Sequence, residues 1–214
     1  MYSVVFIMDK SGSMSSLGVE PVDSLNNFYD LQVKSGEFNT TLIFFNDKVE
    51  FIHKNIESSN IKKINYEDYK PNGMTALYDA IGEAIEYQKT IQNENVIVVI
   101  LTDGHENSSQ KYRGNQIKEL TSKLENDNGW KFIYLGANQD SFDVGSQIGV
   151  NTTADYEYTP LGLNCIMRTI SHNVSECLSG VKKACDIDLK EDVVENLNVT
   201  FDSVNDTRNV ALNS

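Results

Sequence analysis

The sequence predicts an α/β fold with a doubly wound, Rossmann-like, mostly parallel central sheet and helices on both faces. Short apolar segments without polar alternation recur along the chain, which is typical of strands buried on both faces. Amphipathic segments with helical spacing lie between them, and this alternation indicates repeated β–α–β units. The length of 214 residues is enough for one domain with a short appendage.

Five strands can be located, and we expect about six in all. Four segments are short, apolar and β-rich, so they are predicted to be buried. The fifth, residues 49–53, alternates apolar and polar side chains and follows the turn Asn46-Asp47, which predicts an antiparallel strand at one edge. The four buried segments are residues 4–8, 41–45, 96–101 and 131–135.

Five helices are predicted from apolar spacing and end signals. The first begins at about Pro21 and stops near Gly36, and the second follows Thr75. The third covers residues 116–124 and ends before Gly129, a glycine suited to a helix C-terminus. A short helix covers residues 142–148, and the last begins at Thr159-Pro160, a good cap followed by a first-turn proline.

The composition restricts the classes of partner and compartment. A net charge of −13 argues against nucleic acid and against anionic membranes, because both need a cationic protein surface. The 3 cysteines match no zinc-finger spacing and favour a reducing compartment. The chain starts directly with an apolar strand, without a basic leader or a long apolar run. We therefore expect a cytoplasmic protein.

The two ends of the chain differ in character. Residues 186–214 hold seven acids against two bases, and the composition becomes polar after Ala184. We predict a domain over residues 1–183 and an acidic, partly ordered C-terminal extension over residues 184–214. Apolar residues at 193, 194, 197, 199 and 201 could add one more strand or helix to it.

Oxygen-bearing side chains follow two of the buried strands. Asp9, Ser11 and Ser13 come after the first strand, and Asp103 comes after the strand of residues 96–101. Thr75 begins the second helix, where it could also be a simple helix cap. In such a sheet, ligands bind outside the carboxyl ends of the strands. Two carboxylates and three hydroxyls there are the hard ligands that Mg²⁺ prefers.

These residues resemble the metal-ion-dependent adhesion site of the von Willebrand factor type A (vWA) fold. The resemblance rests on Asp9-x-Ser11-x-Ser13, the distant Thr75 and the strand-end Asp103, and it covers roughly residues 2–180. The stretches LTDGHENSS and WKFIYLGANQDSF are most similar to compact single-domain members from bacteria and their viruses.

The resemblance implies a protein-binding module that depends on a divalent ion, Mg²⁺ or else Mn²⁺ or Ca²⁺. Ser11, Ser13 and Thr75 would touch the ion through hydroxyls, while Asp9 and Asp103 would hold it directly or through water. A carboxylate from a protein partner would fill the open position. The resemblance gives no oligomeric state.

Neighbouring residues have more than one interpretation each. Gly12 and Gly73 either let the backbone approach the ion or are ordinary turn glycines. Glu106 and Asn107 either shape partner choice at the site, or add a carboxylate to the shell around the ion, or are solvated loop residues. His105 is expected to be exposed, since a lone imidazole is a poor Mg²⁺ ligand.

Two further functions remain open at this point. The chain could be a regulatory subunit of an ATPase or of a stress- or phage-related complex that uses the same site. A Mg²⁺-dependent hydrolase is disfavoured, because the chain lacks Gly-x-x-x-x-Gly-Lys-Ser/Thr, Gly-x-Gly-x-x-Gly and Gly-x-Ser-x-Gly. Lys10 is the one basic residue close in sequence to Ser11. We therefore expect no enzyme activity.

Overall fold

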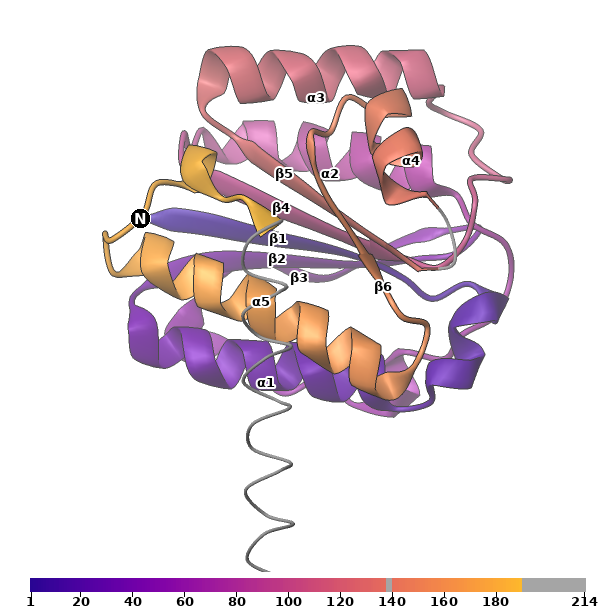
Figure 1. The fold of residues 1–214 in the computed structure, drawn as a ribbon, viewed down its shortest axis with the longest axis horizontal. Coiled ribbons are helices and arrows are strands. Elements are labelled where there is room, and N and C mark those ends of the chain that lie inside the picture. The colour runs from indigo at the N-terminus through magenta and orange to yellow at the C-terminus, as the bar shows by residue number, and fades with distance from the viewer. Residues whose placement is uncertain (138–139, 190–214) are drawn as a thin grey trace, which may run out of the picture.

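The computed structural model describes residues 1–137 and 140–189, and it shows a six-stranded sheet between layers of helices (Figure 1). The strand order is β3-β2-β1-β4-β5-β6, and all neighbours are parallel except β2 and β3. This confirms the predicted doubly wound, mostly parallel fold with one antiparallel edge strand. The strands are β1 (Tyr2–Asp9), β2 (Phe38–Phe45), β3 (Val49–Glu57), β4 (Val96–Thr102), β5 (Lys131–Ala137) and β6 (Thr152–Tyr156).

Helices cover both faces of the sheet (Figure 1). One face carries α1 (Glu20–Ser35) and α5 (Pro160–Leu178), and the other carries α2 (Leu77–Ile91) and α3 (Gly114–Asn128). The short α4 (Ser141–Gln147) packs beside β5 and β6. Single turns of 3₁₀ helix are η1 (Gly12–Leu17), η2 (Ser58–Asn60), η3 (Tyr66–Asp68) and η4 (Ala184–Asp186).

The central strands are apolar because both of their faces are covered. In β1, Phe6 packs in the core on the α1 and α5 side, and the next residue, Ile7, packs in the core on the α2 and α3 side. All residues of β4 are buried. Full burial of an aliphatic or aromatic side chain contributes roughly 1.5–3 kcal/mol, so these strands anchor the fold.

The predicted helix ends have physical causes in the structure. Thr159 caps α5, since its Oγ1 accepts a hydrogen bond from the Gly162 amide at 3.0 Å. Gly129 follows α3 with a φ of 67°, a left-handed conformation that glycine adopts without steric cost. Both helices begin or end where their cap residues stand, although α3 is longer at each end than its apolar pattern predicts.

The sequence does not locate β6. Its sequence, Thr-Thr-Ala-Asp-Tyr, is short and weakly apolar because β6 is an edge strand with partly exposed side chains. β1 and β2 also start before their predicted first residues, at Tyr2 and Phe38. The edge strand matters below, since it leads into a loop at the candidate site.

The first residues of the predicted C-terminal extension pack against the domain. Ala184, Ile187 and Leu189 are buried in the core on the α1 and α5 side. Residues 190–214, with the suggested further strand or helix, lie outside the described residues. The division at residue 183 therefore stays a prediction.

The three cysteines are free thiols in the structure. In the described part of the chain, no helix has the length and apolar character needed to cross a membrane.

Candidate metal centre

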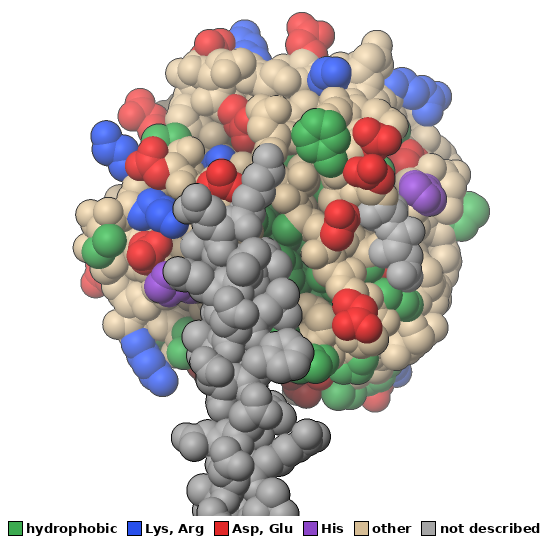
Figure 2. Space-filling view, viewed as in Figure 1, with side chains coloured by type: hydrophobic (Ala, Val, Ile, Leu, Met, Phe, Trp, Pro, Cys, Tyr) green, Lys and Arg blue, Asp and Glu red, His purple; other side chains and the backbone are tan. Residues whose placement is uncertain are grey.

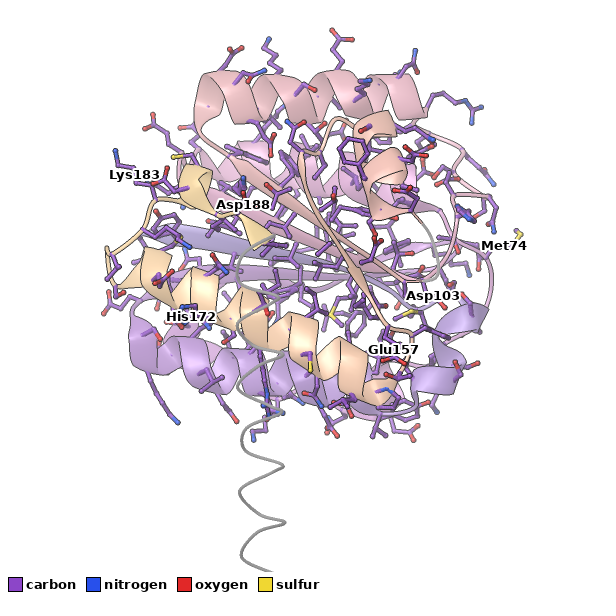
Figure 3. The ribbon with its side chains drawn as sticks, in the orientation of Figure 1. Met74, Asp103, Glu157, His172, Lys183 and Asp188 are labelled. Carbon is purple, nitrogen blue, oxygen red and sulfur yellow. The ribbon has the colours of Figure 1, made fainter. Side chains whose placement is uncertain are left out.

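The predicted site residues lie where the central strands end. Asp9 is the last residue of β1, and Asp103 directly follows β4, the parallel neighbour of β1. Ser11 precedes η1 at its cap position, Ser13 lies in the first turn of η1, and Thr75 lies just before α2. Figure 3 shows Asp103 at the same end of the molecule as Met74 and Glu157, opposite Lys183.

Short contacts join the residues that follow β1 and β4. The Ser11 amide donates to Asp9 Oδ1 at 2.6 Å, and the Ser11 and Ser13 hydroxyls share a hydrogen bond of 3.0 Å. The Ser13 hydroxyl then donates to Asp103 Oδ1 at 2.7 Å. A continuous series of hydrogen-bonded groups therefore runs from Asp9 to Asp103.

Gly104 shows how closely the remaining oxygens converge. A methyl group added to Gly104 would lie 3.0 Å from Thr75 Oγ1 and 3.7 Å from both Asp9 Oδ2 and Ser13 Oγ. Oxygens from three separate positions thus surround one small region beside the Gly104 backbone. With the contacts above, the structure brings all five predicted residues together.

Thr75 is not the cap of the following helix. Ala76 holds the cap position of α2, with no side-chain cap. The first amides of α2 are instead bound from another loop, because Tyr78 N donates to Glu106 Oε2 at 3.0 Å and Asp79 N donates to Ser109 Oγ at 3.1 Å. The hydroxyl of Thr75 therefore does not serve the helix.

Glu106 and Asn107 hold the loop that carries Asp103 against α2. Asn107 Oδ1 accepts from the Thr75 amide at 2.9 Å, and the Asn107 amide donates to the Thr75 carbonyl at 3.0 Å. Besides Tyr78, Glu106 binds the Ser108 and Ser109 amides and the Ser109 hydroxyl. Both residues thus position the site, and Glu106 is not a simple solvated loop residue. His105 is exposed.

Of the two glycine positions near the site, only one requires glycine. Gly73 has a φ of 77°, and a Cβ there would overlap Asp47 Oδ1, so this turn requires glycine. A Cβ added to Gly12 would meet only ordinary contacts, and the Gly12 amide donates to the Gly73 carbonyl at 3.1 Å. The pair joins the turn after β1 to the segment before Thr75.

Three residues outside the predicted set support the site. Thr102 donates its hydroxyl to Asp9 Oδ2 at 2.6 Å, and the Tyr69 hydroxyl donates to the Asp9 carbonyl. The Tyr158 hydroxyl donates to the Ser13 carbonyl. Thr102 stands next to Asp103 in the sequence, so its position at the strand end was a usable signal, whereas the sequence gives no sign that Tyr158 reaches this site.

Burial makes Asp9 hard to ionise. Its side chain is fully buried, which raises the pKa of Asp9 to about 6. Hydrogen bonds from Thr102 and Ser11 lower this pKa in part, and the nearby charge of Asp103 raises it further. A cation beside Asp9 would favour its charged form.

The donor set suits a hard divalent cation. It consists of two carboxylates and three hydroxyls, all oxygen ligands, which Mg²⁺ accepts together with water. In residues 1–137 and 140–189, no group of three or more His, Cys, Asp or Glu side chains is placed to hold a metal ion. An ion at this end would therefore depend on the hydroxyls as well as on Asp9 and Asp103.

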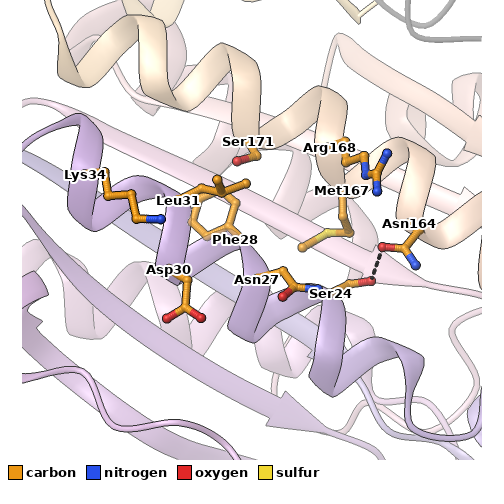
Figure 4. A pocket seen from close by; sticks show the side chains of 10 residues that line it. All are labelled: Ser24, Asn27, Phe28, Asp30, Leu31, Lys34, Asn164, Met167, Arg168 and Ser171. Carbon is orange, nitrogen blue, oxygen red and sulfur yellow. Dashed lines mark hydrogen bonds between the residues drawn. The ribbon is translucent and has the colours of Figure 1, made fainter. Parts of the chain in front are cut away.

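A groove lies elsewhere on the molecule, between α1 and α5 (Figure 4). It has a volume of about 400 Å³, and a hydrogen bond of 3.4 Å between Ser24 and Asn164 crosses it. None of its lining residues belongs to the predicted metal set. The candidate site is thus an oxygen-lined surface at the strand ends and not this groove.

A search of curated protein sequences finds no match. Solved structures, however, include several with a similar fold. Similar solved structures include the PilB minor pilin from Streptococcus sanguinis, with a TM-score of 0.59 and 15% identity over 85% of this chain and 63% of that chain. They also include the vWF domain of the type V pili tip protein Mfa5 from Porphyromonas gingivalis, with a TM-score of 0.58 and 9% identity over 83% of this chain and 96% of that chain.

A third similar structure is a von Willebrand factor type A protein from Catenulispora acidiphila, with a TM-score of 0.58 and 13% identity over 79% of this chain and 41% of that chain. This chain thus spans less than two thirds of the pilin and of the Catenulispora protein. At these identities the likeness shows the fold alone. The sequence profile of the von Willebrand factor type A domain, however, matches residues 3–159, which is most of the chain. The chain therefore belongs to the von Willebrand factor type A domain family, a family of protein-interaction and adhesion modules.

Proposed function

We propose that this chain is an intracellular, metal-dependent protein-binding module. Asp9, Ser11, Ser13, Thr75 and Asp103 hold Mg²⁺, and a carboxylate of a protein partner completes the site. The bound ion supplies a positive charge that attracts this carboxylate. The chain's own residues fix the geometry, since Thr102 and Tyr69 hold Asp9, and Asn107 holds the backbone of Thr75.

The convergence of oxygens around Gly104 is the observation that carries this proposal. Three hydroxyl or carboxylate oxygens lie within 3.7 Å of one point, and they come from the end of β1, the turn after it and the segment before α2. A side chain on Gly104 would occupy the same region. Oxygens from distant parts of the sequence, one of them from a buried carboxylate, thus meet in the way that a site for a hard cation requires, and this supports the proposal.

The surrounding charge makes the ion necessary for carboxylate binding. Residues 140–159 contain four exposed acids and not one Lys, Arg or His. Acidic side chains gather over α4 and β6 in Figure 2, and Glu157 lies at the Asp103 end in Figure 3. Without a cation this surface repels a partner's carboxylate, so binding should depend strictly on metal. The four acids are Asp140, Asp143, Asp155 and Glu157.

A regulatory subunit of an ATPase or of a stress- or phage-related complex would use the same site, and it differs only in the partner. A hydrolase finds less support. Lys10, the one base near Ser11 in sequence, is buried and forms an ion pair with Glu50 at 2.9 Å. This ion pair already engages the Lys10 ammonium, so the structure offers little support for Lys10 as a base that activates Ser11.

The test begins with the metal alone. Mg²⁺ is titrated calorimetrically into the EDTA-treated full chain, and into Asp9→Ala and Asp103→Ala variants. We expect saturable binding by the wild type and none by the variants, with all three folded by circular dichroism. Equal binding by the Asp9→Ala variant would refute the proposed site.

Carboxylate capture is tested separately with peptide pairs that differ only by Glu against Gln. These pairs are screened in Mg²⁺ and in EDTA. We expect Glu peptides to bind in Mg²⁺ only, with no binding to the Asp9→Ala variant. If the chain binds metal but shows no preference for Glu peptides, the metal site remains supported and the capture of a carboxylate is refuted.

A further inference from the structure

The segment from β6 to α5 brings two tyrosines to the candidate metal centre. Tyr158 is bound in full, since its hydroxyl donates to the Ser13 carbonyl and accepts from the Ser16 hydroxyl at 2.8 Å. Tyr156, two residues earlier, is only 6% exposed, and its hydroxyl oxygen is buried without a hydrogen-bond partner among the described residues. One tyrosine thus braces the site, and the other leaves an unused hydroxyl at the end of β6, the strand that leads to it.

An unused buried hydroxyl is costly, so its retention needs a reason. Leaving such a group without a partner costs about 1–3 kcal/mol, and phenylalanine would fill the same space without this cost. Tyr156 otherwise packs like a core residue, on the α1 and α5 side of the sheet. Its ring can therefore be explained by packing, but its hydroxyl cannot.

The strand register sets Tyr156 level with the metal centre. Gly136 of β5 pairs with Thr102, the residue before Asp103, and the next residue, Ala137, pairs with Tyr156. Leu101, Ala137 and Tyr156 all pack on the α1 and α5 side of the sheet, so Tyr156 stands at the Asp103 end on one common face.

Burial raises the pKa of Tyr156 above its ordinary value, and the next largest cause is the charge of Asp103, with Tyr158 and Asp9 following. The raised pKa keeps the hydroxyl protonated. It is a neutral donor close to acceptors that bear negative charge.

We propose that Tyr156 is a positioning residue of the metal centre, whose hydroxyl donates to the Asp103 carboxylate, directly or through one water, when the ion is bound. Groups that bind a metal's ligands from outside orient them and change metal affinity. This inference rests on the proposed function. It adds a residue from β6, a strand that contributes none of the five predicted ligands.

The test compares two tyrosines that differ in where they point. Tyr156→Phe is matched with Tyr29→Phe. Tyr29, on α1, is also buried, but its hydroxyl shares a hydrogen bond of 3.0 Å with the Thr40 hydroxyl. For each variant of the full chain, Mg²⁺ affinity is measured by calorimetry, and metal-free stability is measured by urea unfolding in EDTA.

We expect opposite patterns in the two variants. Tyr156→Phe should bind Mg²⁺ about tenfold more weakly, while its metal-free stability stays equal to that of the wild type or rises. Tyr29→Phe should lose metal-free stability and keep the wild-type Mg²⁺ affinity. A merely structural Tyr156 cannot produce the first pattern, since it changes stability and not affinity.

Two results would overturn the inference. One is an unchanged Mg²⁺ affinity in Tyr156→Phe, and the other is a loss of metal-free stability, which would mean that the hydroxyl already has a partner in the fold. If the wild type itself binds no Mg²⁺, the proposed function fails as a whole. That outcome is distinct from wild-type binding that Tyr156→Phe leaves unaltered.

Discussion

Asp9→Asn should make the metal-free protein more stable at neutral pH, although it removes a central residue of the site. The variant keeps the shape of the side chain. Its Oδ1 can accept from the Ser11 amide, and its Nδ2 can donate to Thr102 Oγ1. The Thr102 proton can then turn to the Gly104 carbonyl, 3.2 Å away. No buried polar group loses its partner.

The size of the gain follows from the pKa of Asp9. Its ordinary value is 3.8, and the folded protein raises it to about 6. At 1.36 kcal/mol for each tenfold change, charging Asp9 in the folded state costs about 3 kcal/mol. Because the pKa is raised on folding, the protonated Asp9 contributes about 3 kcal/mol of stability relative to the charged form. This contribution is fully present below pH 3.8 and is lost as the pH rises through about 6. Asparagine avoids the loss.

The assay is urea unfolding in EDTA at pH 4.5 and pH 8, for wild type, Asp9→Asn and Glu94→Gln. We expect Asp9→Asn to exceed the wild type by about 3 kcal/mol at pH 8 and by much less at pH 4.5. Glu94 is an exposed carboxylate. Glu94→Gln changes the net charge equally and should leave the stability unchanged at both values.

Metal should remove most of this difference at pH 8. Mg²⁺ at a hundred times its dissociation constant stabilises the wild type by about 2.7 kcal/mol, which nearly cancels the gain in Asp9→Asn. The variant should not respond to Mg²⁺. If Asp9→Asn is no more stable than the wild type at pH 8 in EDTA, the burial argument is wrong. A Mg²⁺ response in the variant would remove Asp9 from the metal site.

Three substitutions test other parts of the fold. Thr159→Ala removes the cap that Gly162 binds and should lower the unfolding free energy by about 1 kcal/mol without altering Mg²⁺ affinity; an altered affinity would argue against this. Gly73→Ala puts a methyl group against Asp47 at positive φ and should cost about 1–2 kcal/mol in urea unfolding, a cost that an unstrained turn would not show. Gln32→Leu removes the side-chain amide that binds the buried Ser171 hydroxyl and should cost about 1–3 kcal/mol by thermal unfolding, whereas no loss would mean that this hydroxyl finds another partner.

The strands at the centre of the sheet could be located from the sequence because their surroundings are uniform. β4 is buried throughout, so its residues are apolar without interruption and its end is clear. That clear end also gave Asp103, as the end of β1 gave Asp9. The rule that ligands bind at the carboxyl ends of strands then selects the edge of the sheet where these residues meet.

Apart from Thr102, the support for the site could not be predicted because it depends on contacts between distant segments. Tyr158 reaches Ser13 across an interval of 145 residues. Its approach depends on β6, whose short and half-exposed sequence gives no strand pattern. Glu106 was ambiguous for a related reason, since a carboxylate in a loop has the same sequence signature whether it is solvated or bound to several donors.

The strand order has a consequence for synthesis of the chain. β1 emerges first, but it lies between β2 and β4, so its second neighbour is completed only at Thr102. The residues that surround Gly104 are likewise drawn from positions 9 to 103. A nascent chain shorter than that cannot assemble the ion site, and contacts of such long sequence separation form slowly. If the site binds metal as proposed, the ion is therefore captured late in folding, after β1 and β4 have paired.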